Sequence, residues 1–169
     1  MNNCTVINLC ELGDLTQLKN LYNNGNIKKT CITIGKCYAF HTACENGHLN
    51  ICKWLYETFT LSRKEVLSND YLAFWWACKN GHLLVCTWLH ETFRITNKEF
   101  KTIKNTCLTY AFGFKHYDVV KFLFESFTIT EKDIENVTDI EDLCIYINKE
   151  KLMEFLIPLG SYTKPVCEQ

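Results

Sequence analysis

The side chains best suited to chemistry are the chain's 11 cysteines, which could hold a metal ion, form disulfides or act as nucleophiles. No two of them are spaced as Cys-x-x-Cys, the usual half of a zinc or thiol-redox motif, and their number is odd. Cys44 and Cys52 recur further along the chain, at one common offset, as Cys78 and Cys86. A thiol repeated at equivalent positions is a small buried hydrophobe, so we expect packing roles, with no metal site and no catalytic residue.

Three histidines, His48, His82 and His116, are separated by the same offset. As ligands on successive units of a stack they would lie roughly 10 Å from one another, which is too far to share one metal ion. We therefore expect no metal site here either.

This offset is a 34-residue period, and it organises most of the chain. Residues 43–59 recur as residues 77–93 with most positions identical, and a weaker copy follows at residues 111–127. Fainter copies at residues 9–22 and 144–160 suit the end units of an array. The period predicts a single domain of five units, at about residues 4–34, 35–68, 69–102, 103–136 and 137–169.

Each unit has the pattern of a helix, a tight turn and a second helix. A short apolar stretch from Tyr38 to Asn46 ends at Gly47, which readily adopts the left-handed conformation that closes a helix. In residues 49–55 the apolar side chains follow helical spacing along one face. Stacked units would bury these faces against one another, so the sequence predicts an all-α solenoid.

The segments between the helix pairs contain a second periodic signal. Ser62 and Thr96 are each followed three residues later by a glutamate, and Thr130 is followed by Asp133. This spacing is typical of a capping box at a helix start. It predicts a third, short helix in each central unit.

Residues 40–49, Phe-His-Thr-Ala-Cys-Glu-Asn-Gly-His-Leu, and the copy ending at Leu83 resemble the ankyrin repeat. The family pattern is Thr-Pro-Leu-His-x-Ala-Ala-x-x-Gly-His, followed by a second helix with paired apolar positions. The chain departs from it at Tyr38-Ala39 and Leu72-Ala73, where Thr-Pro would stand, and in having a short capped helix in place of the β-hairpin. This variant looks like the ankyrin arrays of large DNA viruses of amoebae. The resemblance implies that the turn histidines bond the backbone of a neighbouring turn.

The resemblance also implies that the residues before each turn line the concave recognition face of the stack. Trp75 and Trp76 are adjacent, and neighbours on a helix point about 100° apart, so their two rings should not be equally buried. The favoured interpretation is that both fill the groove between units, and the alternative is that one of them is exposed on the inner face. The expected partner-binding residues are Glu45, Asn46, Trp75, Trp76, Lys79, Asn80, Gly113 and Phe114.

Charge and hydropathy exclude other kinds of partner. The chain has 18 Lys and Arg against 19 Asp and Glu, which gives no surplus of cations for binding nucleic acid. It has neither a signal-peptide pattern nor an apolar run of about 18 residues that could span a membrane. We expect a cytoplasmic monomer without cofactors, or one in the host cytoplasm if the protein is viral.

The predicted function is therefore a protein-binding scaffold and not an enzyme, such as a viral or pathogen adaptor that captures a host protein. A structural component of a virion or assembly is an alternative within the same class. The alternative from another class is an enzymatic or small-molecule site grafted on the scaffold, with a pocket formed by Trp75, Trp76 and nearby cysteines.

Overall fold

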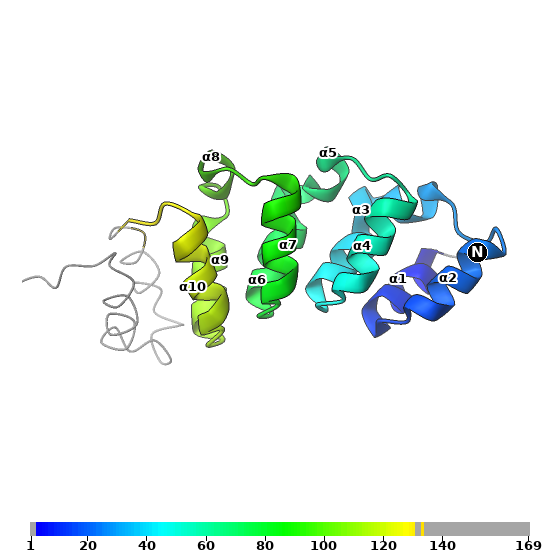
Figure 1. Ribbon diagram of the computed structural model, residues 1–169, viewed down its shortest axis with the longest axis horizontal. Coiled ribbons are helices and arrows are strands. Elements are labelled where there is room, and N and C mark those ends of the chain that lie inside the picture. Colours follow the sequence, from blue (N-terminus) through cyan, green and yellow to red (C-terminus); the bar gives the residue numbers. More distant parts are fainter. Residues whose placement is uncertain (1–2, 131–132, 134–169) are drawn as a thin grey trace, which may run out of the picture. The chain divides into compact units, whose positions relative to one another are not determined.

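The structure is a computed structural model that describes residues 3–130 and residue 133 (Figure 1). Helices form most of this part of the chain, and it contains no strand. The elements are α1 (Asn3–Leu12), α2 (Leu15–Asn23), α3 (Lys29–Glu45), α4 (Leu49–Thr58), α5 (Arg63–Val66), α6 (Ser68–Lys79), α7 (Leu83–Phe93), α8 (Asn97–Phe100), α9 (Lys104–Gly113) and α10 (Tyr117–Ser126).

Within residues 3–127 the helices form two layers (Figure 1). We call α1, α3, α6 and α9 the first-helix layer, because each begins a helix pair and packs against the next in order. Their partners α2, α4, α7 and α10 form the second-helix layer. This confirms the predicted all-α solenoid of helix-turn-helix units. The expected fifth unit, residues 137–169, lies outside the described residues.

A glycine with positive φ closes the first helix of three successive units. The φ values of Gly13, Gly47 and Gly81 lie between +74° and +78°. After α3, the His48 N–H bonds the Ala43 carbonyl at 2.9 Å and the Gly47 N–H bonds the Cys44 carbonyl, which is the Schellman pattern. After α9 the same pattern is closed by Lys115, with φ +63°.

The turn glycines also make room for the histidine of the following unit. A Cβ atom added at Gly47 would lie 2.5 Å from Nδ1 of His82. The Nε2–H of His82 donates to the Glu45 carbonyl at 2.9 Å, and His48 donates to the Glu11 carbonyl in the same way. The expectation that these histidines bond the backbone of a neighbouring turn is confirmed for both.

The capping boxes predicted between the helix pairs are present at α5 and α8. Ser62 pairs with Glu65, and Thr96 with Glu99, and in both boxes side chain and backbone are bonded reciprocally. At the third site, Asp133 accepts from the backbone and hydroxyl of Thr130, but the neighbouring residues lie outside the described part.

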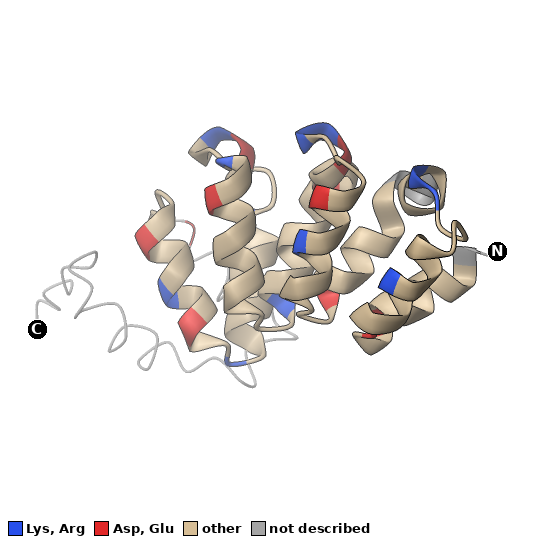
Figure 2. Ribbon diagram, turned by 45° about the vertical axis from the view of Figure 1, so that its right-hand side comes forward, with Lys and Arg blue, Asp and Glu red and all other residues tan. Residues whose placement is uncertain are grey.

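The capping glutamates also join successive units through ion pairs. Glu65 lies 3.6 Å from Lys29, and Glu99 lies 2.7 Å from Arg63, whose Nε also donates to the Phe93 carbonyl. Lys29 and Arg63 are one period apart, as are the two glutamates, so the contact is itself a repeat. Figure 2 shows the resulting adjacent positive and negative residues on α5 and α8.

Two first helices are broken near their start. Asn69, Asp70 and Tyr71 have φ between +53° and +61°, so the regular part of α6 begins at Leu72. One period earlier, Cys37 has φ +66° within α3, and the predicted first helix from Tyr38 is the part of α3 that follows.

The described cysteines bear out the predicted packing role. Seven of the nine are buried, while Cys4 is exposed and Cys31 is half-buried. The Sγ atoms of Cys44 and Cys52 lie 3.5 Å apart, and those of Cys78 and Cys86 lie 3.6 Å apart, across the helix pair of one unit. Burial raises the pKa of the Cys44, Cys78 and Cys86 thiols, and that of Cys10 to about 12, which keeps these four protonated and unreactive.

Candidate partner-binding site

Most of the expected partner-binding residues come together at the ends of α3, α6 and α9. A hollow of about 420 Å³ is lined by Glu45, Asn46, Lys79, Asn80, His82, Phe114 and His116. Five of these residues were expected from the sequence, and they come from three successive units. Gly113 is the last residue of α9 and is not among the residues that line the hollow.

The two asparagines in the hollow have fixed amide groups. The Nδ2 of Asn46 donates to the Thr42 carbonyl at 2.9 Å, and the Nδ2 of Asn80 donates to the Glu45 carbonyl at 2.8 Å. One N–H of each amide is used in this way, so the amide oxygen and the second N–H can serve a ligand. Fixed amides lose little conformational entropy on binding.

Charged residues of both signs occupy one position of the repeat, close to the end of the first helix of each unit. Glu11, Glu45 and Lys79 follow one another at intervals of one period, near the ends of α1, α3 and α6. Burial raises the pKa of Glu45, while the charge of Lys79 acts to lower it and that of Glu11 to raise it. The row that these residues form is therefore negative over the first two units and positive at the third.

A continuous chain of aromatic rings runs beside the hollow across α3, α6 and α9. We call it the aromatic strip, and its members are Tyr38, Trp76, Trp75, Tyr110 and Phe114. Successive ring centroids lie between 5.7 and 6.2 Å apart. The Lys79 ammonium lies 5.1 Å from the centre of the Tyr110 ring, a cation–π contact.

The exposure of the strip sets it apart from the core. Tyr38 and Phe114 are 43% and 55% exposed, although they are large aromatic residues. Trp75 and Trp76 are both half-buried, with their rings at 73° to each other. Neither tryptophan is therefore completely buried.

Sequence reasoning missed Tyr38 and Tyr110 as members of this surface. Tyr110 stands one period after Trp76, so the repeat itself indicated its position. Tyr38 lies four residues before the equivalent position in its own unit, Thr42, and residues at i and i+4 share a helix face. Together the two signals would have shown an aromatic face that crosses units diagonally.

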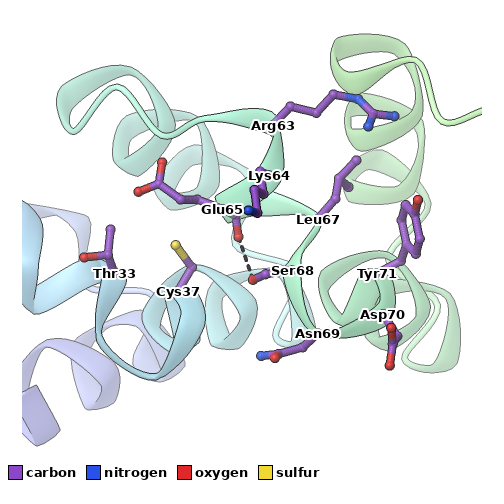
Figure 3. A pocket seen from close by; sticks show the side chains of 10 residues that line it. All are labelled: Thr33, Cys37, Arg63, Lys64, Glu65, Leu67, Ser68, Asn69, Asp70 and Tyr71. Atoms are coloured by element: carbon purple, nitrogen blue, oxygen red, sulfur yellow. Dashed lines mark hydrogen bonds between the residues drawn. The ribbon is translucent and has the colours of Figure 1, made fainter.

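A second hollow, of about 780 Å³, lies between α3, α5 and the start of α6 (Figure 3). Thr33 and Cys37 of α3 face α5 and the broken start of α6 across it. Two of its charged side chains already have partners, because Glu65 caps α5 and Arg63 pairs with Glu99, and its lining lacks the chain of partly exposed aromatic rings. We therefore place the candidate site at the aromatic strip and not here.

The described residues contain no group of three or more His, Cys, Asp or Glu side chains placed to hold a metal ion. No helix among them combines the length and apolar character needed to span a bilayer.

Comparison with known proteins gives one match. A family model described as ankyrin repeats, in three copies, matches residues 6–99, which is more than half of the chain. No curated protein and no solved structure matches the chain.

Proposed function

This chain belongs to the ankyrin-repeat family, and we propose that it binds a partner protein through the aromatic strip and the hollow beside it. Proteins of this family are generally protein–protein interaction scaffolds and are typically not enzymes. In this chain the aromatic strip would be the binding surface, and the chain would act as an adaptor whose partner is a protein of an infected host.

The observation that carries the proposal is the partial exposure of five aromatic rings in one unbroken contact chain over three units. Tyrosine and tryptophan are enriched among the residues that dominate binding energy at protein interfaces. The fixed amides of Asn46 and Asn80 and the charges of Glu45 and Lys79 supply polar contacts around these rings.

The test is capture of partner proteins from host cells by the full chain and by two matched double variants. The site variant is Lys79→Glu with Phe114→Ala. The control is Lys53→Glu with Leu84→Ala, which likewise reverses one cation and removes one exposed apolar side chain, on the second-helix layer. Circular dichroism and thermal melting of all three proteins check that each is folded.

We expect a partner that is captured by the natural chain and the control but lost from the site variant. Equal capture by the natural chain and the site variant would place the interface elsewhere and overturn the proposal. Assembly of the captured complex into a larger regular array, seen by electron microscopy, would favour the structural role over the adaptor role.

A further inference from the structure

The spacing of the units selects among the shapes that a bound segment could have. Neighbouring helices of a layer lie about 8–10 Å apart, and the strip crosses three of them, α3, α6 and α9. A polyproline II helix has three residues per turn and rises about 3.1 Å per residue, so one turn advances about 9 Å. A β-strand repeats every two residues, or about 7 Å, and falls out of step by the third unit.

Of these two extended conformations, polyproline II is the one that repeats in step with the stack. Each turn of such a segment presents the same side to each successive unit. About seven residues would extend from Tyr38 in the second unit to Phe114 in the fourth.

The ring geometry of the strip suits the flat, apolar ring of proline. Trp75–Tyr110 and Tyr110–Phe114 are stacked, at 24° and 11°. In the other two contacts, Tyr38–Trp76 at 83° and Trp75–Trp76 at 73°, the face of one ring meets the edge of the next. Such corners hold a proline ring against an aromatic face. Aromatic-lined grooves are a recurring means of binding polyproline II segments, which lose little entropy because they are already extended.

The polar groups beside the strip complement the backbone of such a segment. A polyproline II segment has no internal hydrogen bonds, so its carbonyl oxygens need donors when it is bound. No hydrogen bond ties the indole N–H of Trp75 or Trp76 to another described residue, and neither nitrogen is buried without a partner. Asn46 and Asn80 each keep a second N–H, one unit apart.

Charge indicates the direction and composition of the segment. The positive end of the row is Lys79, beside Tyr110 and Phe114, and the negative end is Glu45 with Glu11 beyond it. Residues 3–130 as a whole contain 14 Lys and Arg against 10 Asp and Glu. An acidic residue at the Phe114 end of the bound segment would complement this arrangement.

From these observations we propose that the aromatic strip binds a proline-containing polyproline II segment of the partner protein, with an acidic residue held by Lys79. This inference rests on the proposed function and specifies the chemistry of the partner. It is supported by the matching spacing of units and segment, the two perpendicular ring contacts, the available donors and the charge of Lys79.

The test uses the full chain and two arrays of synthetic peptides. The first array carries pairs of prolines three residues apart with varied charges at both ends, and in the second array alanine replaces each proline. We expect binders in the first array, enriched in an acidic residue at one end, and at least tenfold weaker binding of their alanine counterparts. Absence of binders, or equal binding of proline and alanine peptides, would overturn the inference.

Variants of the chain tie binding to the strip. Lys79→Glu should change the preferred residue at that end of the peptide from acidic to basic, while Lys53→Glu leaves the preference unchanged. Phe114→Ala, at an exposed position, should weaken binding about tenfold without lowering the melting temperature. An unchanged preference in Lys79→Glu would contradict the assigned direction and with it the proposal.

The inference and the proposed function can fail separately. Hydrogen exchange on a captured partner locates the segment that becomes protected. If that segment has no proline but its capture depends on the strip, the polyproline II inference fails and the proposed function stands. If capture does not depend on the strip, both fail.

Discussion

Two effects favour glycine at the Gly47 turn: the positive φ of its backbone and the close approach of the His82 ring. Gly25 has only the first of these, so a comparison of the two positions separates the effects. Gly47 has a positive φ and lies against His82, whereas Gly25 has φ +70° but no atom within 4 Å of an added Cβ. Gly25→Ala should therefore lower the free energy of unfolding by about 1 kcal/mol, through backbone strain alone. Gly47→Ala should lower it by more, because the His82 ring must also move.

A double-mutant cycle in urea measures the difference. If His82 is the obstacle, Gly47→Ala should be less destabilising in a His82→Ala background than in the natural chain. Equal effects in the two backgrounds would show that the close approach contributes nothing.

His41 should make stability depend on pH, because its ring is completely buried. Its Nε2–H reaches the Val66 carbonyl only at 3.4 Å, and its Nδ1 has no hydrogen-bond partner among the described residues. Burial lowers the pKa of His41 to about 4. The unfolded chain then takes up the proton first, so stability is full above about pH 6.5 and falls between pH 6.5 and 4, by up to about 3 kcal/mol.

Urea unfolding at several pH values checks this expectation. Between pH 6.5 and 4.5, the free energy of unfolding should change less steeply with pH in His41→Leu than in the natural chain. His82 and His90 contribute to the pH dependence that remains, because burial lowers their pKa values too. Identical slopes would mean that the His41 ring has the same pKa in the folded protein as in the unfolded chain, which would contradict the expectation.

The start of α3 lacks the side-chain cap that α5 and α8 have at the same position of the repeat. Lys28 stands where Ser62 and Thr96 stand in the next two units, and its backbone has the extended conformation of an N-cap, with φ −114° and ψ 161°. Its side chain makes no capping bond. Lys28→Ser should therefore raise the free energy of unfolding by about 0.5–1 kcal/mol, and Ser62→Ala should lower it by a similar amount. Chemical denaturation gives the free energy of unfolding of both variants. A loss of stability in Lys28→Ser would contradict the expected gain.

The helices were largely predictable because each leaves a local signal. The capping boxes at α5 and α8 and the apolar spacing of α4 and α7 depend on residues a few positions apart. The left-handed residues Asn69, Asp70 and Tyr71 had no such signal, because backbone strain there depends on how α5 and α6 meet. Tertiary geometry overrides local preference at that point.

At the scale of the whole molecule, the buried cysteines report separately on the stability of each unit. Cys10 lies in the first unit, Cys44 and Cys52 in the second, and Cys78 and Cys86 in the third. In a stack each unit contacts only its neighbours, and among the described units the first packs only on the second, whereas the third packs on two, so the first should open before the third. We expect the Cys10 thiol to be labelled at lower urea concentration than Cys78 and Cys86.

Pulsed alkylation followed by peptide mass spectrometry measures this order. Cys4, which is exposed, should react at once without urea and serves as the internal reference. Simultaneous labelling of Cys10 and Cys78 would show that residues 3–127 unfold as one cooperative body.

The candidate site was only partly predictable because it crosses units. Glu45, Asn46, Lys79, Asn80 and Phe114 were found by their shared place before a turn. The aromatic strip joins different repeat positions, such as Tyr38 and Trp76, so no single position of the repeat shows it. Its continuity follows from the packing of α3, α6 and α9.

The match between each turn glycine and the next histidine also limits how the array can grow or shrink. If one period of 34 residues is deleted between Gly13 and His116, the turn before the deletion has a glycine and the unit after it has a histidine. The histidine then fits against the glycine as it does in the natural chain. After His116 this no longer holds, because Lys115 occupies the glycine position, and a further unit with a histidine would meet its side chain. Units can therefore be duplicated or lost between Gly13 and His116, whereas a unit that begins with this histidine does not fit directly after the Lys115 turn.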